Sequence, residues 1–166
     1  MGNILLVFAT LFSGFLGYAQ SAAKAKDNCL SLAEVEKILG QQAVLTESSF
    51  EKKDSAFKQK CTYTANKADI KTNNLAHLYC LFEKYDNDLL AQNVYKNILT
   101  GNQNMPNLHK IYNLGDEALR HTDFVNFDMI IIRKGNKLIR LKINKITSLT
   151  SPCELQIIAK KLTDSL

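Results

Sequence analysis

The sequence predicts an α+β domain in which one mainly antiparallel sheet is covered by N-terminal, middle and C-terminal helices. Three observations support this fold class. The segments "FDMIIIRK" and "KLIRLKIN" flank Gly135-Asn136, a two-residue turn that tolerates positive φ, and so predict a β-hairpin. Helix-capping signals stand near both ends of the globular part of the chain. Several short strand-like segments follow one another with brief connections, which favours antiparallel neighbours.

The first helix is predicted to begin after residue 31. Ser31 and Glu34 have the spacing of a capping box, in which each side chain bonds the backbone N–H near the other residue. Gly40 is expected to end the helix, because glycine readily adopts the left-handed conformation found there. The expected apolar face consists of Leu32, Val35, Ile38 and Leu39.

Two further helices are expected, over residues 88–99 and from Pro152 onward. The middle helix begins with an acid and is expected to stop at Gly101. In the last helix, Ser151 is the cap, Pro152 takes the first helical position and Glu154 completes a second capping box. The expected buried residues are Leu89, Leu90, Val94, Ile98 and Leu99 in the middle helix and Leu155, Ile158, Ala159 and Leu162 in the last.

Strands are predicted where apolar and polar residues alternate and β-branched residues are frequent. Besides the hairpin, these segments are "AVLTES", "FKQKCTYT", "HLYCLFEKY", "HKIYNL" and the residues that follow Gly115. The element order is therefore α, β, β, β, α, β, β, β, β, α. The sheet is expected to supply the core, and the C-terminal helix to close it.

The N-terminal residues resemble a secretory signal peptide. An apolar run of about 13 residues is too short for the ~20 that span a bilayer. Small residues at Gly17 and Ala19 then match the pattern that signal peptidase cleaves. We expect residues 1–19 to be the signal peptide, 20–28 a flexible mature N-terminus and 29–166 one α+β domain. The protein is therefore expected to be exported, to the periplasm or the exterior, although retention of the segment as an anchor is the alternative.

Four cysteines, Cys29, Cys61, Cys80 and Cys153, are expected to form disulfides in an oxidising compartment. No two of them form a C-x-x-C pair, which leaves zinc binding and thioredoxin-type redox chemistry without support. Three pairings are possible, and we favour Cys29 with Cys61 and Cys80 with Cys153. Long loops closed in this way are stabilised by about 3 to 5 kcal/mol per bridge in the chain-entropy interpretation.

The formal net charge of +5 is mildly basic. It is compatible with contact to an anionic membrane surface or an acidic partner, and equally with plain solubility. No run of lysines and arginines is interleaved with aromatic residues, so nucleic acid is not an expected partner. A basic cluster surrounds the hairpin turn and consists of Arg133, Lys134, Lys137, Arg140 and Lys142. We interpret it as a solvated outer face that protects a strand edge, with an anion- or partner-binding surface as the alternative.

The stretch "LGDEALRH", residues 114–121, has the densest set of titratable groups in the chain. In a helix, Asp116 would pair with Arg120 and Glu117 with His121. We favour a strand that begins after a turn at Gly115, Asp116 and Glu117, because a helix of this length is too short to be stable. On a strand, Asp116 and His121 would be separated by ~16 Å and would not share a proton.

No catalytic motif is present, and we expect no metal and no cofactor. His77 and Cys80 stand three apart on a predicted strand and would therefore point to opposite faces, which disfavours a shared metal. The expected function is a secreted or periplasmic, non-enzymatic binding or accessory domain for an unknown protein or small ligand of the cell envelope. The alternatives are an inhibitor or immunity-type protein that blocks a partner enzyme, and a small hydrolase that uses His121 with Asp116 or Glu117.

Several of these motifs together resemble small secreted bacterial proteins of the PsbP-like fold group. They are "CLSLAEVEKILGQQ", "CTYT", "LGDEA", the hairpin "MIIIRKGNKLIRLKI" and a C-terminal helix, over residues 28–166. The ending "YAQS" of the signal segment is similar to that of Bacteroidetes exports. The resemblance implies an α-β-α sandwich, a bridge from Cys29 to Cys61, a structural role for the "GDEA" turn and a binding or accessory function. It supplies no catalytic residues, and it does not assign Cys80 and Cys153.

Overall fold

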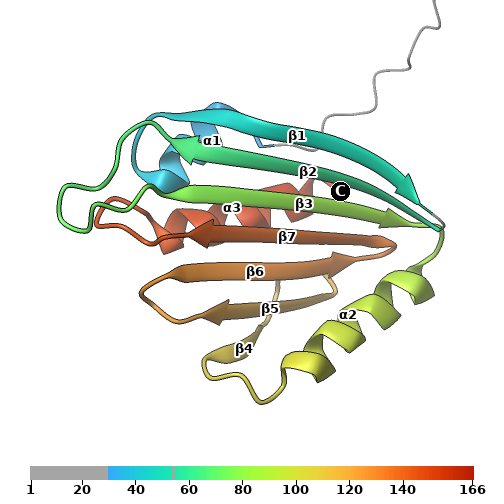
Figure 1. Cartoon of the computed structure of the whole chain (residues 1–166). Coiled ribbons are helices and arrows are strands. Elements are labelled where there is room, and N and C mark those ends of the chain that lie inside the picture. The colour runs from blue at the N-terminus through green and yellow to red at the C-terminus, as the bar shows by residue number, and fades with distance from the viewer. Residues whose placement is uncertain (1–29, 54) are drawn as a thin grey trace, which may run out of the picture.

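A computed structural model describes residues 30–53 and 55–166, which form an α+β fold with three helices and a seven-stranded antiparallel sheet (Figure 1). The predicted fold class and element order are confirmed. The strand order is β1-β2-β3-β7-β6-β5-β4. The elements are α1 Leu32–Leu39, β1 Ala43–Lys53, β2 Ala56–Ala65, β3 His77–Tyr85, α2 Asp88–Asn102, β4 Leu108–Ile111, β5 Glu117–Thr122, β6 Phe127–Lys134, β7 Lys137–Asn144 and α3 Pro152–Asp164.

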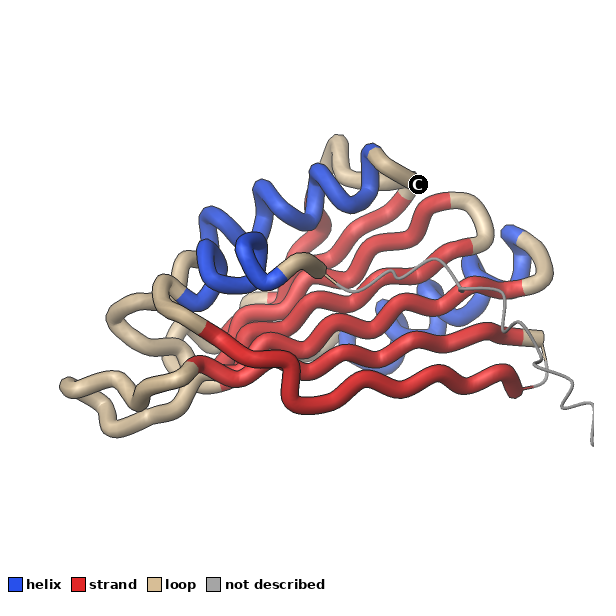
Figure 2. Tube along the Cα trace, turned by 90° about the horizontal axis from the view of Figure 1, so that it is seen from above, coloured by secondary structure: helices blue, strands red, loops and turns tan. Residues whose placement is uncertain are grey.

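The helices cover both faces of the sheet. Figure 2 shows α1 and α3 on one side and α2 on the other. Side chains alternate along each strand, so the two faces have separate cores. The larger core lies beneath α1 and α3, with Leu78 and Leu141 among its strand residues and Ile38 and Ile158 among its helix residues. The smaller core lies beneath α2 and consists of Tyr85, Ala91, Tyr95, Leu119, Ile131 and Leu138.

Local signals in the sequence correctly locate several turns and helix ends. The hairpin joins β6 and β7 at Gly135-Asn136, and Gly135 has a φ of 54°. Ser31 and Glu34 form the complete capping box of α1, which ends at Gly40 with a φ of 70°. In α3, Pro152 begins the helix, and the Ser151 side chain accepts a hydrogen bond from the backbone N–H of Glu154. The predicted second capping box is incomplete, because the Ser151 N–H donates to the Ile38 carbonyl and not to Glu154.

The middle helix differs from the prediction at its end and on its exposed face. It continues through Gly101 to Asn102, so the predicted stop is wrong. A glycine inside a helix costs only about 1 kcal/mol, which adjoining helical turns readily offset. Leu89 is 64% exposed, because the side of α2 that faces the sheet is centred on Ala91 and Tyr95.

Two strands also have boundaries that differ from those expected. The strand predicted over "HKIYNL" is shorter, since β4 ends at Ile111 and the chain then turns, with Asn113 at a φ of 62°. The strand predicted over "AVLTES" is longer and reaches Lys53. Its charged second half can stay in the sheet because β1 is an edge strand whose residues after Ala43 are exposed to solvent.

The predicted signal peptide (residues 1–19), the predicted mature N-terminus (20–28) and Cys29 lie outside the described residues. Among the helices that the structure describes, none combines the length and the apolar character needed to cross a membrane.

Candidate functional site

The "LGDEALRH" stretch forms a turn and a strand, as predicted. Gly115 has a φ of +63°, and a Cβ atom there would lie 2.6 Å from the backbone oxygen of Arg133. The Arg133 guanidinium donates to Asp116 Oδ2 at 2.9 Å and to Glu117 Oε2 at 2.6 Å. Asp116 Oδ2 also accepts from the backbone N–H of Gly135 at 2.8 Å. These contacts tie the start of β5 to the β6–β7 hairpin, so both acids have structural partners.

His121 is separated from both acids. Its ring packs edge-on against Phe127, with ring centroids 4.9 Å apart. Glu117 stands four residues earlier on the same strand, a separation of ~13 Å along an extended chain. Within residues 30–53 and 55–166, the His121 side chain has no hydrogen bond or ion pair. The histidine–carboxylate pair that the hydrolase alternative requires is therefore not assembled.

The residues of the predicted basic cluster make contacts with different parts of the fold. Arg133 belongs to the turn just described. Lys134 and Lys137 lie on the α3 side and donate to main-chain oxygens of Thr163 and Leu166 at 2.9 and 2.8 Å. Cations at a helix C-terminus offset the negative end of the helix dipole. These three residues therefore hold the hairpin and the end of α3 in place.

Arg140 and Lys142 lie on the opposite side of β7, away from Ile139, Leu141 and Ile143, as the alternation predicts. Arg140 donates to Glu83 Oε2 at 2.9 Å. The Lys142 ammonium lies 5.1 Å from the centroid of the Phe127 ring, within the range of a cation–π contact. Of the five basic residues, only Lys142 has neither a carboxylate nor a carbonyl partner among the described residues.

Glu83 is a buried carboxylate that no pattern in the sequence indicates. It is 1% exposed and is bound by Arg140, by Lys58 Nζ at 3.0 Å and by the Tyr85 hydroxyl at 3.1 Å. Burial, with the nearby negative charge of Glu83, raises the pKa of Tyr85 to about 12. Because two cations hold Glu83, its arrangement is that of a structural ion-pair network.

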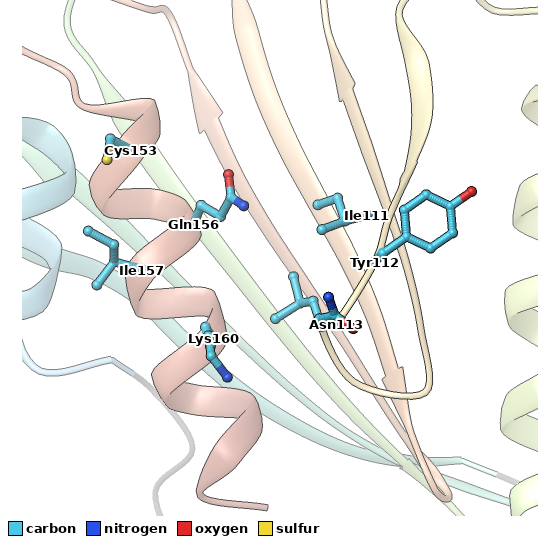
Figure 3. A pocket seen from close by; sticks show the side chains of 8 residues that line it. Ile111, Tyr112, Asn113, Cys153, Gln156, Ile157 and Lys160 are labelled. Carbon is cyan, nitrogen blue, oxygen red and sulfur yellow. The ribbon is translucent and has the colours of Figure 1, made fainter.

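An open groove of about 470 Å³ lies between α3 and the end of β4 (Figure 3). One wall is the outer side of α3, and the other is the chain from Ile111 to Leu114 that follows β4. Ile111 and Gln156 face each other across it in Figure 3. Tyr112 on one rim is 80% exposed and Ile157 on the other is 53% exposed. Two large apolar side chains thus remain in contact with solvent beside one concave surface.

Polar groups lie at both ends of the α3 wall. Lys160 Nζ pairs with Asp164 at 2.9 Å, one turn further along the helix. Cys153 is an exposed free thiol in the first turn of α3. The sequence does not predict this groove, because its two walls are about forty residues apart in the chain. The one indication in the sequence is Ile157, an apolar residue outside the predicted buried face of the last helix.

The free thiol corrects one disulfide prediction. Because Cys153 is unbonded and exposed, the expected bridge from Cys80 to Cys153 is wrong. Leu155 and Ile158 are the α3 residues that face the sheet, whereas Cys153 points away from it, and Cys80 lies in the larger core opposite Cys61. Cys61 is disulfide-bonded. The pairing of Cys61 with Cys29 stays a prediction, since Cys29 is outside the described residues.

Within the described part of the chain, no three histidine, cysteine or acidic side chains are grouped so that they could hold a metal ion. His77 lies on the opposite side of β3 from Cys80, as the strand alternation predicts, and its Nδ1 is 3.0 Å from the Thr64 hydroxyl. Comparisons with protein-family models, curated proteins and solved structures find no match.

Proposed function

We propose that this protein is an exported, non-enzymatic binding domain, and that its groove between α3 and the end of β4 holds an extended, apolar peptide segment of a partner protein. The observation that carries the proposal is the exposure of Tyr112 and Ile157 on the two rims of one groove. Large apolar side chains gathered around a concave surface are typical of interaction sites. The signal-peptide pattern of residues 1–19 supports export to the periplasm or the exterior.

A peptide fits the groove better than a small molecule does. Pockets for small molecules enclose most of the ligand surface, usually 70–90% of it or more. This groove is partly open to solvent, and an extended chain can lie in it while one side stays in solvent. Tyr112 adds a feature common at protein interfaces, where tyrosine combines a large apolar ring with a hydroxyl that stays hydrated.

The arrangement of helices on both faces of an antiparallel sheet supports a place for the chain in the PsbP-like fold group. That resemblance implies a binding or accessory role. The ion-paired acids at Glu83, Asp116 and Glu117 are consistent with a non-enzymatic role, because each is already held by Arg133 or Arg140.

The test uses a display library of random peptides, selected on the mature, oxidised protein. The affinity of a selected peptide is then measured by fluorescence anisotropy for the wild type, Ile157→Glu and Ile70→Glu. Ile70 is a fully exposed isoleucine in the loop between β2 and β3, so it provides the same substitution away from the groove. Ile157→Glu would place a charge where an apolar contact worth ~1.5–3 kcal/mol forms. We therefore expect it to weaken binding of the peptide at least tenfold.

The expected result is a loss of affinity in Ile157→Glu and an affinity within about twofold of wild type in Ile70→Glu. Circular dichroism on both variants checks that the fold is intact, which we expect because both side chains are exposed. Selection of no peptide, or of peptides whose affinity depends on Ile70 rather than Ile157, contradicts the proposal.

A further inference from the structure

The edge of the sheet formed by β1 is a second exposed surface, remote in sequence from the groove. β1 is the outermost strand, and its outer edge has no strand partner in the described residues. A bulge between Leu45 and Glu47 interrupts its pairing with β2, but from Glu47 to Lys53 the register continues without a break. We call residues 47–53 the 47–53 edge. Its unpaired backbone groups can accept another strand.

An exposed aromatic residue lies at the middle of this edge. Phe50 is 52% exposed, and its ring centroid is 5.8 Å from that of Phe57 on the neighbouring strand. Both rings lie on the α1 and α3 side of the sheet, because Phe57 packs against the larger core. Figure 1 shows α1 beside the beginning of β1, while the second half of the strand extends away from it. The helix therefore leaves the 47–53 edge accessible.

We infer that the 47–53 edge pairs with the same edge of a second copy of the chain, antiparallel, about a two-fold axis at Phe50. This proposal is independent of the groove and of its peptide. In a symmetric antiparallel pair the axis is perpendicular to the sheet, so directly opposed residues have numbers whose sum is twice that of the central residue. Centred on Phe50, Glu47 lies opposite Lys53 of the second copy, and Phe50 lies opposite itself.

The charges of the edge select this register over its neighbours. Centring on Ser49 would place Glu47 opposite Glu51, and centring on Glu51 would place that glutamate opposite its own copy. Like charges directly opposite each other destabilise strand pairing, whereas opposite charges stabilise it. Only the register centred on Phe50 joins two glutamate–lysine pairs with the burial of both Phe50 rings. Each Phe50 already contacts Phe57, so the interface would contain four aromatic rings.

Cross-linking tests the register directly. In a Cys153→Ser background, which removes the exposed thiol, Phe50→Cys would bring two identical thiols face to face across the axis. Directly opposed residues in an antiparallel pair have Cα atoms ~4.5–5.5 Å apart, a separation that a disulfide can span. Lys52→Cys is the matched control, because it is exposed on the same side of the same strand, has no cysteine opposite it on β2 and would lie opposite Ser48 of the second copy.

We expect mild oxidation to convert Phe50→Cys to a covalent dimer and to leave Lys52→Cys largely monomeric. A charge test avoids any change to the aromatic ring. Lys53→Glu would face Glu47 and is expected to weaken dimerisation roughly tenfold in sedimentation equilibrium, whereas Lys52→Glu would face Ser48 and change it little. A monomeric wild type across a wide dilution series, or equal cross-linking of the two cysteine variants, overturns the proposal.

Discussion

The two faces of the sheet are held to their helices in different ways. On the α1 and α3 side, polar contacts reinforce the larger core. Lys134 of β6 donates to the Thr163 carbonyl of α3 at 2.9 Å, and Lys161 of α3 pairs with Glu34 of α1 at 2.6 Å. On the other side, no hydrogen bond or ion pair joins α2 to a strand in the part of the chain that the structure describes. Its attachment is apolar and rests on the smaller core.

This difference indicates where the fold is anchored. The α1 and α3 side closes the sheet with two helices that also contact each other, whereas α2 covers only part of its face. The uncovered part retains Lys142, Phe127 and His121, which are half-buried and contact one another through their rings and the ammonium group. We therefore expect substitutions beneath α1 and α3 to cost more stability than matched substitutions beneath α2.

The largest expected loss of stability comes from replacing either of two leucines of β7 with alanine. Leu141 and Leu138 are both fully buried, but Leu141 faces α1 and α3 while Leu138 faces α2. We expect Leu141→Ala to lower the free energy of unfolding by about 3–5 kcal/mol and Leu138→Ala by about 2–3 kcal/mol. The reason is that α2 can move inward and shrink the cavity, whereas α3 is fixed by its polar contacts. Urea denaturation measures both, and equal losses would contradict the comparison.

The next largest effect on the free energy of unfolding is expected at Asp69, and this effect depends on pH. Its carboxylate accepts from the hydroxyl of Ser148 at 2.6 Å and from the backbone N–H of Ser148, and these two bonds join the loop after β2 to the chain before α3. It also accepts from the backbone N–H groups of Thr72 and Lys71 within its own loop. These hydrogen bonds, that from Ser148 foremost, lower the pKa of Asp69 below its ordinary value. Folding thus favours the charged form of Asp69. Its contribution to the free energy of unfolding is therefore complete above the unfolded pKa of ~3.9 and is lost as pH falls.

We expect Asp69→Asn to destabilise the protein most at neutral pH, with the difference from wild type shrinking below about pH 5. Urea midpoints at neutral and acidic pH measure this difference. Asp164→Asn is the control, because Asp164 is exposed and, among the described residues, its side chain pairs only with Lys160. A difference between wild type and Asp69→Asn that stayed constant down to about pH 2 would show that the carboxylate charge does not contribute.

Features set by neighbouring residues could be predicted from the sequence, and features set by distant ones could not. The capping box at Ser31, the hairpin turn at Gly135 and the turn at Gly115 each depend on a few adjacent residues. The partners of Glu83 come from two strands besides its own, and the groove requires α3 to lie beside the chain that follows β4. No pattern within one segment contains that information, because it arises when the sheet assembles.

The disulfide pairing also depends on distant residues and could not be predicted from the sequence. The spacing of Cys80 and Cys153 allowed a bridge, but the rotation of α3 about its axis decides where Cys153 points. Leu155, Ile158 and Ala159 face the sheet, and this places Cys153 on the exposed side of the helix. The apolar pattern of the helix was sufficient to predict its buried face, with Leu162 partly rather than fully buried.

The smallest expected effect is a gain in stability on the α2 side. Gly101 lies inside α2, and no atom lies within 4 Å of the position that a Cβ would occupy there. Gly101→Ala should therefore stabilise the helix by about 0.5–1 kcal/mol, chiefly by reducing the conformational freedom of the unfolded chain. Gly115→Ala is the opposite case and should destabilise, because it combines a φ of +63° with a contact of 2.6 Å.

Two measurements of the gain from Gly101→Ala distinguish two ways in which α2 can be attached to the sheet. If α2 unfolds together with the sheet, the urea midpoint rises; if α2 detaches alone, only the hydrogen-exchange protection of its own amides rises. We expect the urea midpoint to rise, because Ala91 and Tyr95 are almost completely buried against the strands and link the unfolding of α2 to that of the sheet. A gain confined to the α2 amides would mean that apolar contacts alone are too weak to couple this helix to the fold.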